Sequence, residues 1–144
     1  TTGSEELIGL LRQRSRPYLF SNTVSPSIVA AGIKVFEIIN NESELKSKLN
    51  ENTLYFRTQM KKIGFNIIEG THPIVPVMLN DASKAKKMAT EMLLEGIYVV
   101  GFYYPVVPKG KARIRIQISA AMEKDHLDKA LHSFQKVGKK FNLI

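Results

Sequence analysis

Two arginines separated by one residue carry the clearest chemical signal in the sequence. Residues 112–119 read ARIRIQIS, in which isoleucines alternate with polar side chains. Because successive side chains of a strand point to opposite faces, Arg113, Arg115 and Gln117 should share the face opposite the isoleucines. A planar guanidinium donates two parallel hydrogen bonds to a carboxylate or phosphate, so this face could bind an anionic group. The alternation does not separate Arg113 from Arg115, and a solvated edge with ordinary surface arginines is the alternative.

A basic segment interleaved with aromatic residues is a second candidate site. Arg12, Arg14 and Arg16 precede Tyr18 and Phe20. This mixture suits phosphate contact and base stacking in a nucleic-acid-binding protein. The same arginines also suit the C-terminal end of a helix, where the helix dipole favours positive charge. The residues alone leave both interpretations open.

Hydroxyl and amide side chains follow that segment directly. Ser21, Asn22 and Thr23 could donate hydrogen bonds to a phosphate, and loop capping is the alternative. The chain contains no GxSxG, P-loop or GxGxxG motif, so by itself it does not resemble an enzyme. We expect no metal site, because the three histidines lack the i+3 or i+4 partners of common metal motifs. They are His72, His126 and His132.

Cap residues and periodicity predict the elements that must position these side chains. Ser4, Pro26 and Asp81 mark helix starts, and Asn41 with Glu44 resembles a capping box. Apolar periodicity predicts helices over residues 5–14, 26–40, 42–63, 82–95 and 125–140, with irregular chain up to residue 23 after the first helix. β-branched and aromatic runs predict strands over residues 65–68, 74–79, 97–100 and 112–119. The C-terminal part would then have the order αββαββα.

Composition and charge describe a folded chain with an anionic partner. The 144 residues include 44% hydrophobic and 24% charged side chains, enough for one substantial core. The absence of cysteine excludes disulfides and thiolate metal sites. The net charge of +8 favours nucleic acid, a phosphate cofactor, a carboxylate substrate or an acidic lipid as partner. No apolar run approaches the roughly 20 residues needed to span a bilayer, so we expect no membrane partner.

Three runs of the sequence together resemble one enzyme family. They are residues 11–22, 96–108 and 111–121. They are similar to the C-terminal part of the pyridoxal-phosphate-dependent α-oxoamine synthases, in particular the glycine C-acetyltransferase (2-amino-3-ketobutyrate coenzyme A ligase) branch. The similarity extends over essentially the whole chain, and the run RQRSRPYLFSN is specific to that branch. One departure is Met122, where relatives often carry histidine.

This resemblance implies a fold and a domain organisation. The fold class would be α/β, the C-terminal part of a fold-type I pyridoxal-phosphate transferase, with a small antiparallel or mixed sheet packed with helices. Residues 1–40 would form the end of the large cofactor-binding domain and a linking helix. Residues 41–144 would form the small C-terminal domain.

The resemblance also implies an activity and a set of site residues. The full-length enzyme would condense glycine with acetyl-CoA to 2-amino-3-ketobutyrate and CoA, or catalyse the reverse cleavage in threonine degradation, as a homodimer with pyridoxal phosphate. Arg115 would bind the substrate carboxylate. Ser21 and Asn22 would bind the phosphate of the cofactor in the partner subunit. The lysine that binds the cofactor would lie upstream of Thr1, so we expect no catalytic residue in this segment and no activity from it alone.

Other assignments remain to be separated from this one. They are another α-oxoamine synthase, a basic nucleic-acid-binding module and a purely structural dimerisation domain. Nucleic-acid binding would weaken steeply with salt, but the chain has no recognised RNA- or DNA-binding motif. The resemblance favours the enzyme, without nucleic acid as a partner. Its localisation would be cytoplasmic in a bacterium and mitochondrial in a eukaryote.

Overall fold

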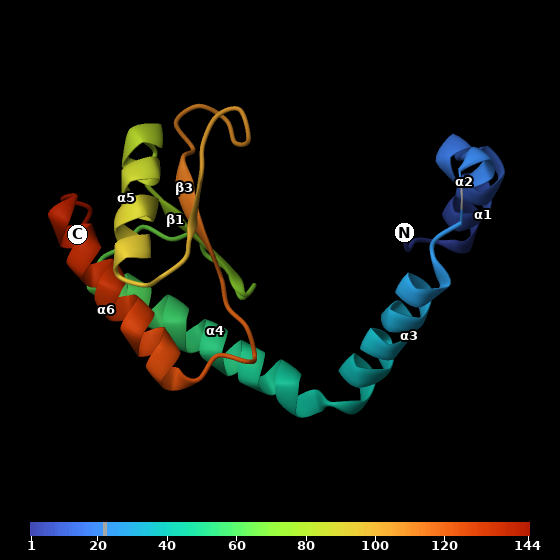
Figure 1. The fold of residues 1–144 in the computed structure, drawn as a ribbon, viewed down its shortest axis with the longest axis horizontal. Coiled ribbons are helices and arrows are strands. Elements are labelled where there is room, and N and C mark those ends of the chain that lie inside the picture. The colour runs from blue at the N-terminus through green and yellow to red at the C-terminus, as the bar shows by residue number, and fades with distance from the viewer. Residues whose placement is uncertain (22) are drawn as a thin grey trace. The chain divides into compact units, whose positions relative to one another are not determined.

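The computed structural model describes residues 1–21 and 23–144, which form two compact units. The units are Thr1–Asn41 and Glu42–Ile144 (Figure 1). The first unit consists of the helices α1 (Glu5–Arg14), α2 (Arg16–Phe20) and α3 (Pro26–Asn41). Ser4 caps α1 as predicted, since its Oγ accepts a hydrogen bond of 3.3 Å from the backbone N–H of Leu7. No described side chain of this unit is buried, and most large apolar residues of α3 are exposed.

The chain after α1 is more regular than the sequence predicts. Arg16 and Pro17 start the short helix α2 rather than an irregular stretch. A proline is tolerated in the first turn of a helix, because the N–H that it lacks would have no acceptor there. Ser21 ends α2, and its backbone N–H donates to the carbonyl of Pro17 at 3.1 Å.

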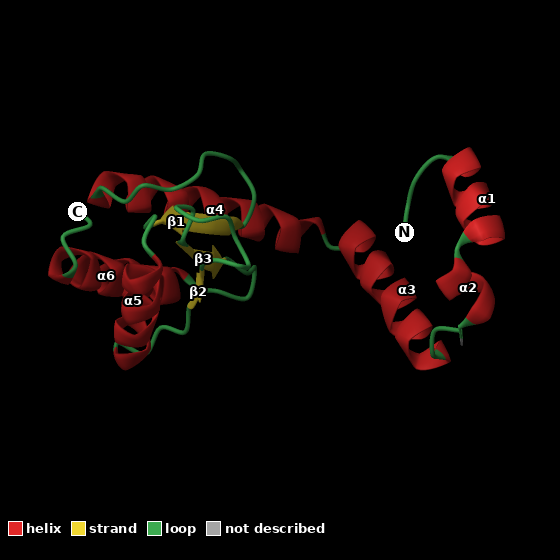
Figure 2. Ribbon diagram, turned by 90° about the horizontal axis from the view of Figure 1, so that it is seen from above, coloured by secondary structure: helices red, strands yellow, loops and turns green. Residues whose placement is uncertain are grey.

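The second unit packs three helices with a small antiparallel sheet (Figure 2). The helices are α4 (Ser43–Ile63), α5 (Ala82–Leu94) and α6 (Lys124–Lys140). The strands are β1 (Ile74–Met78), β2 (Val100–Phe102) and β3 (Arg113–Gln117), in the spatial order β1-β3-β2. Both strand pairings are antiparallel. The α/β fold class with a small sheet is therefore confirmed.

A hydrophobic core lies between the helices and one face of the sheet. The strands β1 and β3 alternate buried with more exposed side chains, as the period of two predicts. Phe134 of α6 meets Phe56 and Phe65 edge-on, with ring centroids 6.4 and 5.8 Å away. The buried side chains of the two strands are Val75, Val77, Ile114 and Ile116. Burial of the isoleucine face leaves Arg115 on the opposite face.

The strand predicted over residues 65–68 is wrong. Only an isolated bridge between Ile67 and Val77 forms there. In the register of this bridge, the donor to the carbonyl of Ile68 would be the backbone N–H of residue 76, but Pro76 has no N–H. That carbonyl instead accepts a hydrogen bond of 2.8 Å from Nη1 of Arg57. The order of the second unit is consequently αβαββα.

The strand predicted over residues 97–100 lies further along the chain, because β2 begins only at Val100. The backbone N–H of Ile97 donates to the carbonyl of Met92 at 2.9 Å and thereby closes the end of α5. This end-capping bond takes the N–H that a strand at Ile97 would direct to its neighbour.

The helix ends show which local sequence signals predict a cap correctly. Asp81 caps α5 as predicted, with Oδ1 accepting from the N–H of Lys84 at 2.7 Å. Gly64 ends α4 as predicted, with a left-handed φ of 108°. The predicted capping box at Asn41 is wrong, because Asn41 is the last residue of α3 and Glu42 precedes α4 without a side-chain cap.

Candidate functional site

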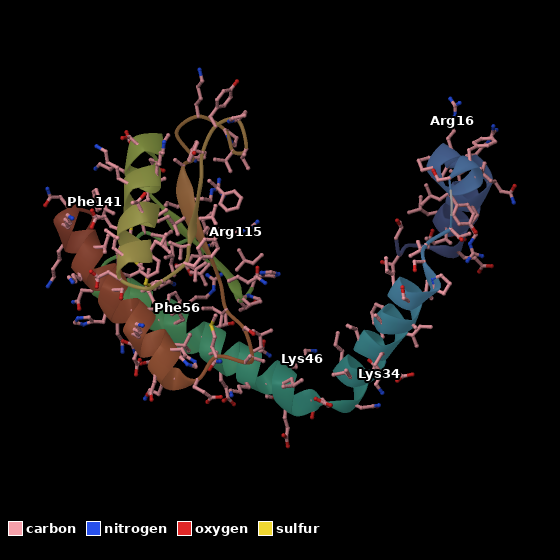
Figure 3. The ribbon with its side chains drawn as sticks, in the orientation of Figure 1. Arg16, Lys34, Lys46, Phe56, Arg115 and Phe141 are labelled. Atoms are coloured by element: carbon pink, nitrogen blue, oxygen red, sulfur yellow. The ribbon has the colours of Figure 1, made fainter. Side chains whose placement is uncertain are left out.

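Arg115 lies in the middle of the sheet on its outer face. It belongs to the central strand β3, where Pro76 of β1 and Val100 of β2 are its partners in register. Its neighbours Ile114 and Ile116 are buried, whereas Arg115 is exposed. Figure 3 shows Arg115 on the side of the sheet away from α5. The strand therefore presents this guanidinium outward from a rigid position.

An aromatic ring supports the guanidinium of Arg115. Its Cζ atom lies 4.3 Å from the centroid of the Phe102 ring. Within the part of the chain that the structure describes, Arg115 makes no hydrogen bond or ion pair with another side chain or carbonyl. The N–H groups of Arg115 are therefore available to an anionic ligand.

Arg113 differs from Arg115 although both lie on the same strand face. Arg113 is half-buried, and its Nε donates to the carbonyl of Lys111 at 3.0 Å. One edge of its guanidinium is thus already occupied by its own chain. The structure separates two arginines that the alternating sequence pattern treats as equivalent.

A cavity of about 480 Å³ adjoins Arg115. Its walls come from residues 96–100, from β3 and from the first turns of α6, and most of the lining side chains are apolar. Arg115 and His126 are among the polar residues that line it. The Nδ1 atom of His126 accepts a hydrogen bond of 3.0 Å from the N–H of Glu123, so a neutral His126 carries its proton on Nε2. The cavity combines an apolar body with cationic and donor groups, as small-molecule sites commonly do.

An ion pair holds the start of α6 against α4 near this cavity. Lys48 Nζ lies 2.5 Å from Oε1 of Glu123, the residue that precedes α6. The hydrogen bond from Lys48 lowers the pKa of Glu123 below its usual value, and the charges of Lys48 and His126 add to this effect. Glu123 therefore stays ionised at neutral pH and keeps this contact between the two helices.

The remaining candidate residues lie in the first unit. Ser21 is exposed and lies in extended backbone directly after α2, outside the helix. Asn22 lies outside the described residues. Arg12 and Arg14 occupy the last turn of α1, which supports the helix-dipole interpretation, while Phe20 is 81% exposed.

Metal and membrane features are not found in residues 1–21 and 23–144. That part of the chain holds no group of three or more side chains placed to bind a metal ion. It also contains no helix that is sufficiently long and apolar to cross a membrane. His72 has a local contact, because its Nδ1 accepts a hydrogen bond of 3.1 Å from the N–H of Ile74.

The sequence does not predict the support of Arg115 by Phe102 or the structural role of Arg57. The predicted strand over residues 97–100 ends before Phe102, so the sequence does not predict that Phe102 pairs beside β3. Arg57 is only 7% exposed and donates hydrogen bonds of 2.8 to 3.1 Å to the carbonyls of Ile68, His72 and Ile74. The sequence signal available for this role was the place of Arg57 directly after Phe56 on the predicted helix over residues 42–63.

The sequence of this chain matches one family model and is similar to curated proteins. The model of the family described as aminotransferase class I and II matches residues 1–134. A 2-amino-3-ketobutyrate coenzyme A ligase of Escherichia coli K12 is 51% identical over all 144 residues, and an 8-amino-7-oxononanoate synthase of Thermosipho melanesiensis is 46% identical over 142 residues. The chain spans 36% of the length of each of these relatives.

A solved structure shows the same fold. The K265A variant of serine palmitoyltransferase from S. paucimobilis, with a bound PLP–myriocin aldimine, is 28% identical and has a TM-score of 0.88. The match covers 94% of this chain and 35% of that protein.

Proposed function

The chain belongs to the aminotransferase class I and II family, and from this premise we propose that it supplies the C-terminal part of a glycine C-acetyltransferase. The whole enzyme joins glycine to acetyl-CoA, giving 2-amino-3-ketobutyrate and CoA, or catalyses the reverse cleavage. The 51% identity to the Escherichia coli ligase over the full 144 residues supports this assignment. Residues 1–40 belong to the large cofactor-binding domain and its linking helix, and residues 41–144 form the small domain.

The guanidinium of Arg115, which has no hydrogen-bond partner among the described residues, is the observation that carries the proposal. It lies exposed on a central strand and is backed by Phe102 at 4.3 Å. Its planar fork matches a carboxylate, to which it donates two parallel hydrogen bonds. Arg115 therefore binds the carboxylate of glycine, whereas Arg113 is held by the carbonyl of Lys111.

The residues of this chain also fit a phosphorylated cofactor. The exposed hydroxyl of Ser21 follows α2 in extended backbone, where it can donate to a phosphate oxygen. Ser21 and Asn22 bind the phosphate of pyridoxal phosphate in the partner subunit of a homodimer. The cofactor, when bound, supplies the electron sink for the carbanion of glycine. The residues of this chain hold the two anionic ends, the substrate carboxylate and the cofactor phosphate.

A substrate panel tests the proposal against its sister activities. The full-length enzyme is assayed with glycine, alanine or serine as the amine, and with acetyl-CoA, a medium-chain acyl-CoA or palmitoyl-CoA as the thioester. We expect the highest kcat/KM for glycine with acetyl-CoA. A preference for another pair would reassign the chain to a different α-oxoamine synthase, an outcome that the 46% identity to the Thermosipho protein makes worth measuring.

A further inference from the structure

We propose that Phe102 is a positioning residue that holds Arg115 in the orientation in which it receives the substrate carboxylate. The inference rests on the role proposed for Arg115. It adds that the ring of Phe102, rather than a hydrogen-bond partner, sets the direction of the guanidinium.

Strand register brings the two side chains together. In the antiparallel ladder Val100 is opposite Arg115, and Phe102 is opposite Arg113. Phe102 is therefore a diagonal neighbour of Arg115, and long or aromatic side chains reach such neighbours on one sheet face. The distance of 4.3 Å from the Arg115 Cζ to the ring centroid is within the range of a cation–π contact.

A ring is a suitable support for a guanidinium that must bind a carboxylate. A ring that packs on the flat face of a guanidinium leaves the N–H edges free. A carbonyl or carboxylate support would occupy those N–H groups, as the carbonyl of Lys111 does for Arg113. Arg115 has no such acceptor among the described residues, so the contact with Phe102 is what restrains its guanidinium there.

Close packing on the other side of β2 fixes Phe102 itself. A Cβ atom added at Gly101 would lie 3.0 Å from the backbone oxygen of Ala85 in α5, so β2 runs directly against that helix. The next side chain along the strand, Phe102, then points to the opposite face. Phe102 is half-buried there, which limits the motion of its ring.

Restraint of Arg115 before the substrates bind should affect the affinity for glycine but not the affinity for acetyl-CoA. A free arginine side chain loses rotamer entropy when it binds a ligand, and a side chain already held in place loses less. Loss of the ring should therefore weaken the binding of glycine and leave the binding of acetyl-CoA unchanged.

The test uses three substitutions in the full-length holoenzyme. Phe102→Leu removes the aromatic face with little change in apolar volume, Phe102→Tyr keeps the face, and Phe141→Leu is the matched control. Phe141 is also a half-buried phenylalanine, and Figure 3 shows it near the C-terminal end of α6, away from Arg115. The glycine Kd is measured by calorimetry, and KM for both substrates and kcat by steady-state assay.

We expect Phe102→Leu to raise the glycine Kd and KM by about 3-fold to 10-fold, the range of a cation–π contact of this kind. KM for acetyl-CoA should change by less than about 2-fold, Phe102→Tyr should restore glycine binding, and Phe141→Leu should leave it unaltered. In an Arg115→Ala background, Phe102→Leu should have no further effect on the glycine Kd, because the two residues act through one interaction.

Contrary results separate the inference from the function on which it rests. If Arg115→Ala weakens glycine binding but Phe102→Leu does not, Phe102 has no positioning role and the proposed function stands. An equal effect of Phe102→Leu with and without Arg115 would also refute the positioning role. If Arg115→Ala leaves glycine binding unchanged, the proposed role of Arg115 fails, and the inference fails with it.

Discussion

The buried Arg57 and the exposed Arg115 show that one type of side chain can have two different roles, one in the fold and one in ligand binding. Arg57 has its guanidinium inside the second unit and donates to the carbonyls of Ile68, His72 and Ile74. Arg115 is exposed and is free of such acceptors among the described residues. Hydrogen bonds already formed within the chain make Arg57 a structural residue, while free N–H groups make Arg115 suited to a ligand.

Replacement of Arg57 should destabilise the second unit without affecting the ligand site directly. Arg57→Leu leaves three backbone carbonyls without this donor, so we expect the free energy of unfolding to fall by about 2–4 kcal/mol. Arg113→Leu removes one hydrogen bond and should cost about 0.5–1.5 kcal/mol. Urea denaturation of both variants, followed by circular dichroism, measures the difference. Equal losses would show that the carbonyl contacts of Arg57 contribute little.

At the scale of elements, the structure depends on close contacts that a local sequence pattern cannot express. The strand β3 and the cap of α5 could be predicted, because alternation and a single Asp81 are sufficient signals. The strand predicted at residues 65–68 is reduced to a bridge because it lies opposite Pro76, which lacks the N–H that a longer ladder needs. The late start of β2 depends on how α5 closes at Ile97. The separation of Arg115 from Arg113 required the same three-dimensional information.

Gly138 is one such close contact, between α6 and the chain after α4. A Cβ atom at Gly138 would lie 2.5 Å from Cζ of Phe65. Gly138→Ala should therefore force Phe65 to shift and destabilise the second unit by about 1–3 kcal/mol. Gly9→Ala is the control, because no atom lies within 4 Å of an added Cβ there and alanine favours a helix. Urea denaturation in which Gly138→Ala matches the wild type would contradict the tight packing described here.

The ion pair between α4 and α6 should make stability depend on acid pH. The hydrogen bond from Lys48 lowers the pKa of Glu123 in the folded chain. The stabilisation from the ionised Glu123 is therefore fully present above the pKa that Glu123 has in the unfolded chain. It is lost as the pH falls through the lower pKa that Glu123 has in the folded chain. We expect the wild type to lose more stability than Glu123→Gln between pH 5 and pH 3, as measured by urea denaturation. Parallel losses would show that this contact does not stabilise the fold.

At the scale of the whole molecule, the two units differ in what they can do alone. The second unit has a buried core, whereas no described side chain of Thr1–Asn41 is buried. The chain also spans only 36% of the length of its ligase relative. The proposed activity accordingly requires the full-length protein, for which we propose a homodimer in which Ser21 and Asn22 would bind the cofactor of the partner subunit.

A subunit-mixing experiment tests that composite site. The full-length double variant Ser21→Ala, Asn22→Ala should lose affinity for pyridoxal phosphate while it keeps its fold. Mixed with a variant that lacks the cofactor-binding lysine, it should regain activity in part, because one site of each heterodimer then has both the lysine and intact phosphate donors. Absence of recovery, with subunit exchange demonstrated separately, would place both groups within one subunit.

The most direct measurement of the central claim is the KM for glycine of two full-length variants, Arg115→Ala and Arg113→Ala. A hydrogen bond to a charged partner contributes roughly 1.5–3 kcal/mol, so Arg115→Ala should raise the glycine KM by about 10-fold to over 100-fold. Arg113→Ala should raise it far less, since Arg113 is bound to the carbonyl of Lys111. Arg115→Lys should restore only part of the loss, because an ammonium group lacks the two-pronged geometry. Equal effects at the two arginines, or none at Arg115, would contradict the assignment of Arg115 as the carboxylate-binding residue.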